Sequence, residues 1–475
     1  MNYTTKQRVR SIGDVPNCFM IPHELEDFRS ISTTTEVAED GRELYIFDGQ
    51  YDPNEDNHYC ACCGTKMHIN RELNTNLRHL PYGNSLTFVR FSRKQYRCPN
   101  CGKTEMERIP FRAEHHRMTK ALEDYIRKLL ARGYTNKEIE NMTGADQCAV
   151  KAIDKERLRL NYTEGEEGDD GSVSCTLKKP ETYSTFLIID EFKLHNNYQY
   201  ATHIVDAATG HILWIDHGKN KDVIYRFIEH VGEEWMSHVE AVACDMNSDF
   251  QEAFEERCEW IQPVFDHFHI VKNFNEKVIS AVRKDEQKRL SEAGNTEAAR
   301  ALKRTKYILT SDRKTLRRKD AEAAEGKVLS KADEMFHRPQ VNRHGGYEQK
   351  YNELLKQNKL LFTVDLVKEQ LADAYTERAE NAMADKITQI INICNATGNA
   401  HFKWFARLLS SHFEGIIAHA TYNISTGKIE GINRKINTIR NNAYGYPDDD
   451  YFFLKVIDAS YKPYVRNLQS HKISN

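Results

Sequence analysis

Two aspartates that follow apolar runs are the residues best suited to hold a metal ion. Asp190 comes directly after Thr185–Ile189, and Asp245 comes directly after Val239–Cys244. An ionised carboxylate beside buried strands is costly to desolvate unless a cation pairs with it. Two such residues on adjacent strands can share one divalent ion, although each could instead cap the turn or helix that follows. Carboxylate oxygens favour Mg²⁺ or Mn²⁺ over zinc.

A third carboxylate, Glu430, lies in an amphipathic segment far along the chain. Four isoleucines there recur with helical spacing: Ile429, Ile432, Ile436 and Ile439. They predict a helix whose apolar face packs on a sheet. Glu430, Asn433 and Arg434 share a second, polar face, which would present Glu430 to the strand ends and let Asn433 and Arg434 touch a phosphate. The spacing alone fits a solvated amphipathic helix equally well.

Four cysteines form two Cys-x-x-Cys-Gly pairs, a spacing typical of structural zinc. The first pair is Cys60 with Cys63, and the second is Cys98 with Cys101. Four thiolates suit one tetrahedral Zn²⁺, and the glycine after each pair permits a left-handed turn that points backbone amides at sulfur. Cys62 could replace Cys63, although the following glycine favours Cys63. A β-hairpin with its turn at 81–84 is expected between the pairs.

Residues 119–159 are predicted to form a helix-turn-helix. Thr135 and Glu138 form a capping box that opens the second helix, and Asp146 caps the third. Three basic residues are expected on the outer face of the third helix: Lys151, Lys155 and Arg157. A basic helix in this position suits the major groove of DNA. A plain three-helix packing module is the alternative.

The segments around the aspartates follow the order β-β-β-α-β-α-β-α. Apolar runs predict five strands, at 185–189, 200–205, 211–215, 239–244 and 262–265. This order predicts an α/β fold with a mixed five-stranded sheet flanked by helices, the order of a ribonuclease-H-like core. Asp266 and His269 follow the fifth strand and could support the site or position DNA, and a structural role suits His269 equally.

Composition limits the class of protein. At roughly 150 residues per domain, 475 residues allow about three domains. Eleven cysteines are too sparse for a disulfide scaffold. No long apolar run and no apolar signal segment are visible, so a cytoplasmic protein without a membrane span is expected. The net charge of −3 is low for a nucleic-acid binder, but Lys277–Lys331 holds sixteen Lys or Arg against eight Asp or Glu. Such a basic arm can follow a phosphate backbone, although a solvated face is the commoner meaning.

These patterns divide the chain into seven parts. The expected parts are a partly ordered lead-in (1–56), a zinc-ribbon-like domain (57–112), a helix-turn-helix domain (113–160), a linker (161–180), the first part of the core (181–275), a basic helical insertion (276–400), and the second part of the core with the Glu430 helix and a C-terminal tail (401–475).

Several blocks of residues resemble one family, the bacterial insertion-sequence transposases of the ISL-three type. The blocks are Ile189–Phe192, Ala243–Asn247, Phe265–Lys272, Lys428–Ile436 and Ala443–Tyr446. The cysteine pairs and the helix-turn-helix precede them in that family's order. The resemblance covers about residues 58–460.

The resemblance implies an Asp-Asp-Glu active site formed by Asp190, Asp245 and Glu430 on a ribonuclease-H-like fold. Two Mg²⁺ or Mn²⁺ ions would be held there, for hydrolysis of a DNA strand and transfer of the freed 3′ hydroxyl to target DNA. The expected partners are double-stranded DNA, as terminal inverted repeats and target, and further copies of the chain in a homodimer or larger synaptic complex. Such a protein would be bacterial and nucleoid-associated when bound to DNA.

Two other functions compete with this one. A transposase-derived regulator would keep the zinc and helix-turn-helix parts without needing the carboxylates. A ribonuclease-H-like nuclease would cut without strand transfer. The presence of all three carboxylates favours an enzyme.

Overall fold

The computed structural model describes residues 10–11, 25, 27–38, 40–51, 58–167, 173–196, 199–246, 248–265, 267–324, 346–424, 427–443 and 446–462. They form two compact units. The first consists of the residues up to Lys178 with Ile439–Lys455, and the second of Lys179–Thr438 with the residues from Val456. Helices α19 (Gly427–Asn442) and α20 (Asp449–Tyr461) therefore each contribute to both units. None of the described helices is long and apolar enough to cross a membrane.

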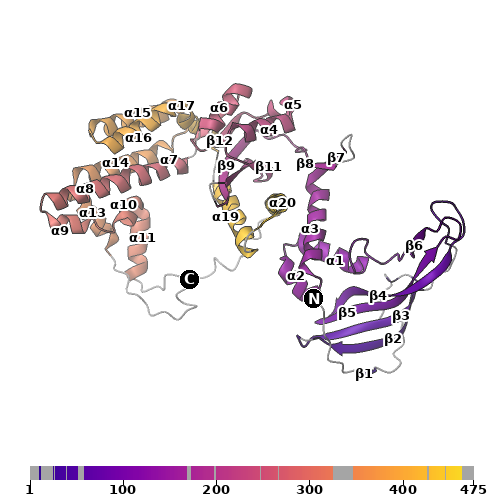
Figure 1. Ribbon diagram of the computed structural model, residues 1–475. Helices are drawn as coiled ribbons and strands as arrows, with labels where there is room; N and C mark the ends of the chain where they lie inside the picture. Colours follow the sequence, from indigo (N-terminus) through magenta and orange to yellow (C-terminus); the bar gives the residue numbers. More distant parts are fainter. Residues whose placement is uncertain are drawn as a thin grey trace. The chain divides into compact units, whose positions relative to one another are not determined.

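The first unit is built on a long hairpin of β4 (His68–Tyr82) and β5 (Ser85–Arg97). The predicted hairpin between the cysteine pairs is confirmed. The sheet order is β1-β2-β3-β5-β4, with β6 (Thr104–Met106) also on β5 and β1 (Arg10–Ser11) at the edge (Figure 1).

Strands β2 (Phe28–Val37) and β3 (Glu43–Tyr51) lie in the stretch expected to be a partly ordered lead-in. Strand β3 pairs in parallel with β5, and this long-range pairing buries Phe47 beside Val89. Because the order comes from distant partners, local periodicity does not reveal these strands.

Three helices follow the sheet in the first unit. They are α1 (Lys120–Ala131), α2 (Asn136–Thr143) and α3 (Gln147–Tyr162). The capping box of Thr135 and Glu138 is present, and the Asp146 side chain accepts a hydrogen bond from the Cys148 amide. These predicted caps are confirmed, because each depends only on residues within one turn.

Helix α3 also packs against the part of α20 that belongs to the first unit. Leu158 forms a small core with Tyr451 and Leu454. Beside it, the fully buried Asp154 carboxylate accepts hydrogen bonds from the Tyr451 hydroxyl at 2.7 Å, from Lys455 Nζ at 2.8 Å and from Arg157 Nη2 at 2.9 Å. One buried carboxylate therefore pairs with two cations, Arg157 and Lys455, and its bond to Tyr451 joins residues 297 positions apart.

Where a linker is expected at 161–180, the chain forms a second hairpin. Strand β7 (Thr163–Glu167) starts directly after α3 and pairs antiparallel with β8 (Val173–Leu177). The Lys178 amide donates to the Tyr162 carbonyl and closes the base of the hairpin. The predicted linker therefore includes paired strands, and the boundary between the two compact units, between Lys178 and Lys179, falls within its predicted range.

The second unit holds a mixed sheet of order β11-β10-β9-β12-β13. Its strands are β9 (Phe186–His195), β10 (Gln199–Asp206), β11 (Ile212–His217), β12 (Ala241–Cys244) and β13 (Gln262–Phe265). Strands β9 to β11 are antiparallel, whereas β9, β12 and β13 are parallel. The predicted mixed five-stranded sheet is confirmed.

Helices α4 (Lys221–Val231), α5 (Glu233–Met236), α6 (Ser248–Arg257) and α7 (His267–Asn273) alternate with these strands. The one helix expected between the third and fourth strands is divided into α4 and α5 at Gly232, whose φ of 87° is left-handed. Alternate residues of β9 and β12, including Leu187 and Val242, share a core with Phe227 of α4.

The described residues between 276 and 400 are helical, as predicted. A π-helical stretch, η2 (Phe274–Ile279), leads into α8 (Ser280–Glu292). Then follow α9 (Thr296–Ala301), α10 (Lys306–Thr310), α11 (Arg313–Ala324), α13 (Tyr347–Gln357), α14 (Lys359–Ala374), α15 (Glu380–Ala396), α16 (Ala400–Ser411), α17 (Phe413–Ile417) and α18 (His419–Tyr422).

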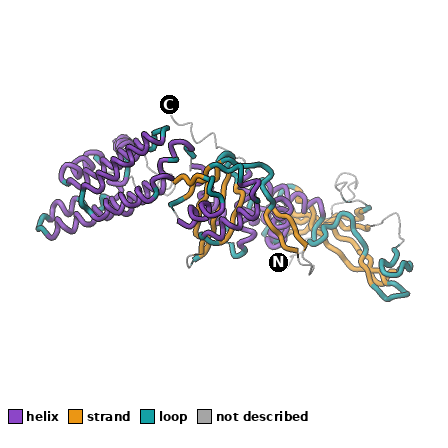
Figure 2. The backbone as a smooth tube through the Cα atoms, turned by 90° about the horizontal axis from the view of Figure 1, so that it is seen from above, coloured by secondary structure: helices purple, strands orange, loops and turns teal. Residues whose placement is uncertain are grey.

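These helices pack along one another, with α14, α15 and α16 side by side (Figures 1 and 2). Their apolar side chains, such as Phe405 of α16, belong to the same core cluster as Leu187 of the sheet. The insertion and the sheet therefore share one hydrophobic core and are not separate domains.

The Asp154 cluster gives a first prediction. Asp154→Ala leaves Arg157 and Lys455 without their buried anion, which should cost about 3–5 kcal/mol of stability. Asp146→Ala, which removes only a helix cap, should cost about 1 kcal/mol.

The four tryptophans of the chain (Trp214, Trp235, Trp260 and Trp404) all lie in the second unit, so their fluorescence reports on that unit. During urea unfolding of the full chain, Asp154→Ala should lower the midpoint of a far-ultraviolet circular-dichroism transition and leave the tryptophan midpoint in place. Equal midpoints for the Asp154 and Asp146 variants would show that the cluster does not stabilise the unit.

Candidate active site and zinc site

Asp190 and Asp245 are brought level with each other by the pairing of β9 and β12. In the parallel register Ala243 lies opposite Ile188; Asp190 follows two residues later within β9, and Asp245 follows two residues later, directly after β12. Continued by two residues, this register sets Asp190 opposite Asp245. Side chains alternate along a strand and neighbouring strands lie about 4.8 Å apart, so both carboxylates share one face of the sheet.

The sequence prediction for the strand ends is half right. Asp245 directly follows the last residue of β12, as predicted. Asp190 lies inside β9, which continues to His195 because its second half pairs with β10. Asp190 is therefore beyond the end of the parallel partner strand but not beyond the end of its own.

Asp190 contacts helix α19. Its Oδ2 accepts a hydrogen bond of 2.7 Å from Asn433 Nδ2, and its Oδ1 accepts one from the Glu191 amide at 2.9 Å. Across the hairpin it lies opposite His203, which is completely buried. Burial lowers the pKa of His203 to about 4, against the effect of the Asp190 charge, so this ring is neutral at pH 7. In the described part of the chain, no cationic side chain bonds to Asp190.

Asp245 has a different partner, His269 of α7. Nδ1 of His269 lies 3.0 Å from Oδ1 of Asp245, and the Met246 amide donates to the same oxygen at 2.7 Å. Burial raises the pKa of Asp245, but the hydrogen bond and charge of His269 outweigh it and hold the pKa below its usual value. Of the two residues expected to support the site, His269 contacts it, and Asp266 lies outside the described residues.

Glu191 is a further acid at this place. Burial, together with the charges of Asp190 and Asp245, raises its pKa. Its Oε2 atom is buried and has no hydrogen-bond donor among the described residues, and the same holds for Oδ1 of Asn433. Two oxygens without donors therefore lie on residues adjacent to or bonded to Asp190.

Glu430 does not join the aspartates in this structure. Its side chain is 61% exposed and pairs with Arg434 one turn further along α19. Among the described residues, the group whose metal-ligating atoms lie within 4.8 Å of one another is a set of cysteines, not the three carboxylates. Asn433, three residues after Glu430, makes the contact with Asp190 instead, which puts Glu430 one helical turn from the site.

The basic residues of α3 do not form the open face that the sequence predicts. Lys155 bonds to Asp448 at 2.9 Å and Lys151 lies 3.2 Å from the same carboxylate. Burial raises the pKa of Asp448, but the hydrogen bonds from Lys155 and Lys151 and from the Tyr451 amide lower it to about 2. The placement of Arg157 on the outer face is wrong, because Arg157 is 9% exposed and binds Asp154.

The four expected zinc ligands come together in the first unit. Sγ of Cys60 lies 3.5 Å from that of Cys101, and Sγ of Cys63 lies 3.5 Å from that of Cys98. The two knuckles are built alike: the amides of Gly64 and Gly102 donate to the carbonyls of Cys60 and Cys98. Both glycines have left-handed φ values, 68° and 71°. Cys62 is exposed and outside the group, which settles the choice in favour of Cys63.

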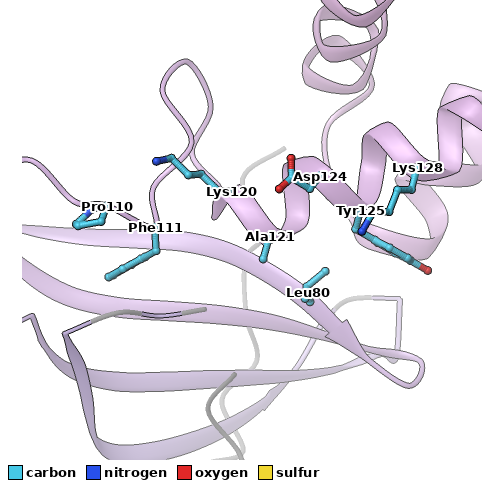
Figure 3. A pocket seen from close by; sticks show the side chains of 8 residues that line it. All are labelled: Leu80, Pro110, Phe111, Lys120, Ala121, Asp124, Tyr125 and Lys128. Carbon is cyan, nitrogen blue, oxygen red and sulfur yellow. The ribbon is translucent and has the colours of Figure 1, made fainter. Parts of the chain in front are cut away.

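A pocket of about 340 Å³ also lies in the first unit, between β4 and α1. Lys120, Asp124 and Lys128 follow one face of α1, with Tyr125 beside them and Phe111 and Leu80 below (Figure 3). Asp124 lies between the two lysines and offsets part of their charge, so this pocket is a weaker anion site than its lysines alone suggest.

Comparison with known proteins identifies the family of this chain. A family model described as a transposase, of the ISL3 type, matches residues 187–456, which is more than half of the chain. The chain belongs to the ISL3 transposase family. A second model, described as the zinc-finger of transposases IS204, IS1001, IS1096 and IS1165, matches residues 56–101 of this transposase and includes all four cysteines.

A curated relative supports the same assignment. This transposase is 26% identical over 406 residues to the transposase for insertion sequence element IS1001 from Bordetella parapertussis. The match spans 84% of this chain and 87% of the relative. The resemblance noted from the sequence is thereby confirmed, and with it an enzyme class that acts on DNA.

The zinc site gives a second prediction. Cys98→Ser should lower the zinc content of the purified transposase by about one ion per chain, because tetrahedral structural sites need all four ligands. Cys62→Ser, a change of the same kind at an exposed thiol one residue from a ligand, should keep its zinc. Elemental analysis measures both, and equal zinc content in the two variants would rule out the assigned ligand set.

Proposed function

We propose that this transposase cuts and joins DNA at an Asp-Asp-Glu site formed by Asp190, Asp245 and Glu430 on a ribonuclease-H-like sheet. Two observations support the proposal. The parallel register of β9 and β12, continued by two residues, sets Asp190 opposite Asp245. Asn433 of α19 donates a hydrogen bond to Asp190. Helix α19 is thus held over the carboxylates by a residue one turn from Glu430.

The side chains present fit Mg²⁺ or Mn²⁺. The candidate ligands are all oxygens, and Asp190 is a half-buried carboxylate without a bonded cation among the described residues. Beside it, Oε2 of Glu191 and Oδ1 of Asn433 are buried and accept no hydrogen bond from a described residue, so a nearby cation would stabilise them as well. Such divalent ions, held by Asp190, Asp245 and Glu430, would activate a water nucleophile and stabilise the leaving 3′ oxygen of the DNA strand.

The residues of the chain would divide the remaining work. His269 keeps Asp245 ionised and fixes its orientation, and Asn433 fixes that of Asp190. Glu430 would have to leave Arg434, and an exposed pair of this kind contributes only about 0–1 kcal/mol. Three residues of helix correspond to a rise of about 4.5 Å, so a change of side-chain rotamer moves Glu430 towards the sheet without unfolding α19.

The first unit would bind the ends of the element. Its zinc knuckles and helix-turn-helix are joined in one body, which suits recognition of duplex DNA. Contact through Lys151 and Lys155 would require DNA phosphate to displace Asp448. Because two ends must be joined, a homodimer or larger synaptic complex is the expected assembly.

A third prediction concerns the metal-binding aspartates. Asp245→Ala should bind a labelled duplex from the element's end as the wild type does but nick it at least about a hundredfold more slowly, since a coordinated metal lowers the activation barrier by several kcal/mol. Asp222→Ala on α4, an exposed aspartate outside the site, is the matched control and should nick normally. Wild-type nicking by Asp245→Ala would exclude Asp245 as a ligand.

A fourth prediction separates Glu430 from Asn433. Glu430→Gln keeps the bond between Asn433 and Asp190 and should therefore fold normally, yet it should lose nicking by at least about a hundredfold. Glu229→Gln, an exposed glutamate on α4, should retain full activity. If Glu430→Gln remains active, the third ligand is another acid, and Glu191→Gln is then the variant to measure.

A further inference from the structure

The helical insertion contains a groove that concentrates positive charge. It lies between α8 and α9 and has a volume of about 590 Å³. Lys284 and Lys288 of α8 line it together with Arg300 of α9 and Lys303, which follows α9. Glu292 is the one acid in the lining, so four cations face one carboxylate.

The packing of α8 explains why two of its three acids, Asp285 and Glu286, lie outside the groove. Asp285 binds His401 of α16 at 2.8 Å, and Glu286 accepts a bond from Asn358, which caps α14, at 2.6 Å. These acids are turned towards neighbouring helices of the bundle. The face of α8 that carries Lys284 and Lys288 is left without them.

The groove cations differ from other basic residues of the insertion. Arg289 binds Glu286, Arg313 binds Asp365, and Lys386 binds both Asp373 and Glu377. Within the described residues, by contrast, Lys284, Arg300 and Lys303 make no ion pair. Lys288 has only a loose contact of 3.9 Å with Glu292, in which both side chains are largely exposed.

The composition of the groove selects the kind of partner. Its lining is polar apart from Ala299, which is buried. Centres of protein–protein interfaces are depleted in lysine and depend on aromatic anchors, which this groove lacks. Contacts to nucleic-acid phosphates are made by lysine and arginine side chains. Lys284 and Lys288 are separated by a helical rise of about 6 Å, close to the length of duplex axis that two phosphates of one strand occupy at about 3.4 Å each.

We propose that the α8–α9 groove binds the phosphate backbone of duplex DNA without reading its sequence. The inference rests on the proposed function for the presence of DNA, but it assigns a second DNA-binding surface, on the insertion, that the carboxylates do not require. It predicts a contribution to affinity that depends on salt and is equal for every DNA sequence.

The test measures binding of the full-length transposase to fluorescent duplexes by anisotropy, without added Mg²⁺. The double variant Lys284→Glu/Arg300→Glu should bind both an element-end duplex and a duplex of arbitrary sequence at least about tenfold more weakly. The slope of log K against log salt concentration should fall by about two, because each of the two replaced cations would no longer neutralise a phosphate. Glu292→Lys should act in the opposite direction, with tighter binding and a steeper slope.

Lys403→Glu is the matched control, because this lysine is exposed on α16 and does not line the groove. It should bind both duplexes like the wild type. Equal weakening by Lys403→Glu and by the double variant would overturn the proposal, since only net charge would matter. So would a groove-dependent affinity for an acidic peptide that matches that for DNA, which would indicate a protein partner. Nicking by the wild type is scored separately, so the groove and the carboxylate site can fail independently.

Discussion

The parallel pairing of β9 with β12 is the constraint on which the proposed chemistry depends. Strands β10 and β11 and helices α4 and α5 separate these two strands in the chain, yet their register places Asp190 and Asp245 at one level. A shift of one residue would send one of the two carboxylates to the opposite face of the sheet. The apolar side chains of these strands, which share a core with the long helical insertion, fix that register, so the core sets the spacing of the two aspartates.

Charge around the carboxylates is arranged unevenly, and this asymmetry gives each acid a separate role. Asp245 has a histidine that keeps it ionised, Glu430 has an arginine that holds it outside, and Asp190 has only amide donors and a neutral, buried histidine nearby. Asp190 therefore has the greatest need for an external cation. Glu430 is the proposed ligand whose position can change, because its partner Arg434 is exposed and weakly held.

Features that depend on neighbouring residues were predictable from the sequence. The capping box at Thr135, the hairpin between the cysteine pairs and the strand before Asp245 all follow from local spacing. Features that depend on distant partners were not. Asp448 neutralises lysines about 300 positions earlier, and nothing near Lys155 in the sequence indicates it. The position of His203 is only weakly indicated by the sequence, because it follows from the antiparallel pairing of β9 with β10, which sets His203 opposite Asp190.

The sequence patterns also do not show that two partners can compete for the same side chain. Arg157 looks like a DNA contact by type and position, but a buried aspartate on the same helix binds it. Glu430 looks like a ligand in place, but the i, i+4 arginine holds it first. In both cases a partner on the same helix binds the side chain, and a linear pattern does not rank partners by distance.

Sharing α20 between the units has a consequence for biosynthesis. Tyr451 emerges from the ribosome 297 residues after Asp154, a delay of roughly 15–60 s at about 5–20 residues per second. During that interval α3 carries an uncovered apolar strip around Leu158 and an aspartate without two of its donors. The N-terminal unit can complete its fold only after nearly the whole polypeptide is made, so a nascent or truncated transposase would carry an unfinished first unit.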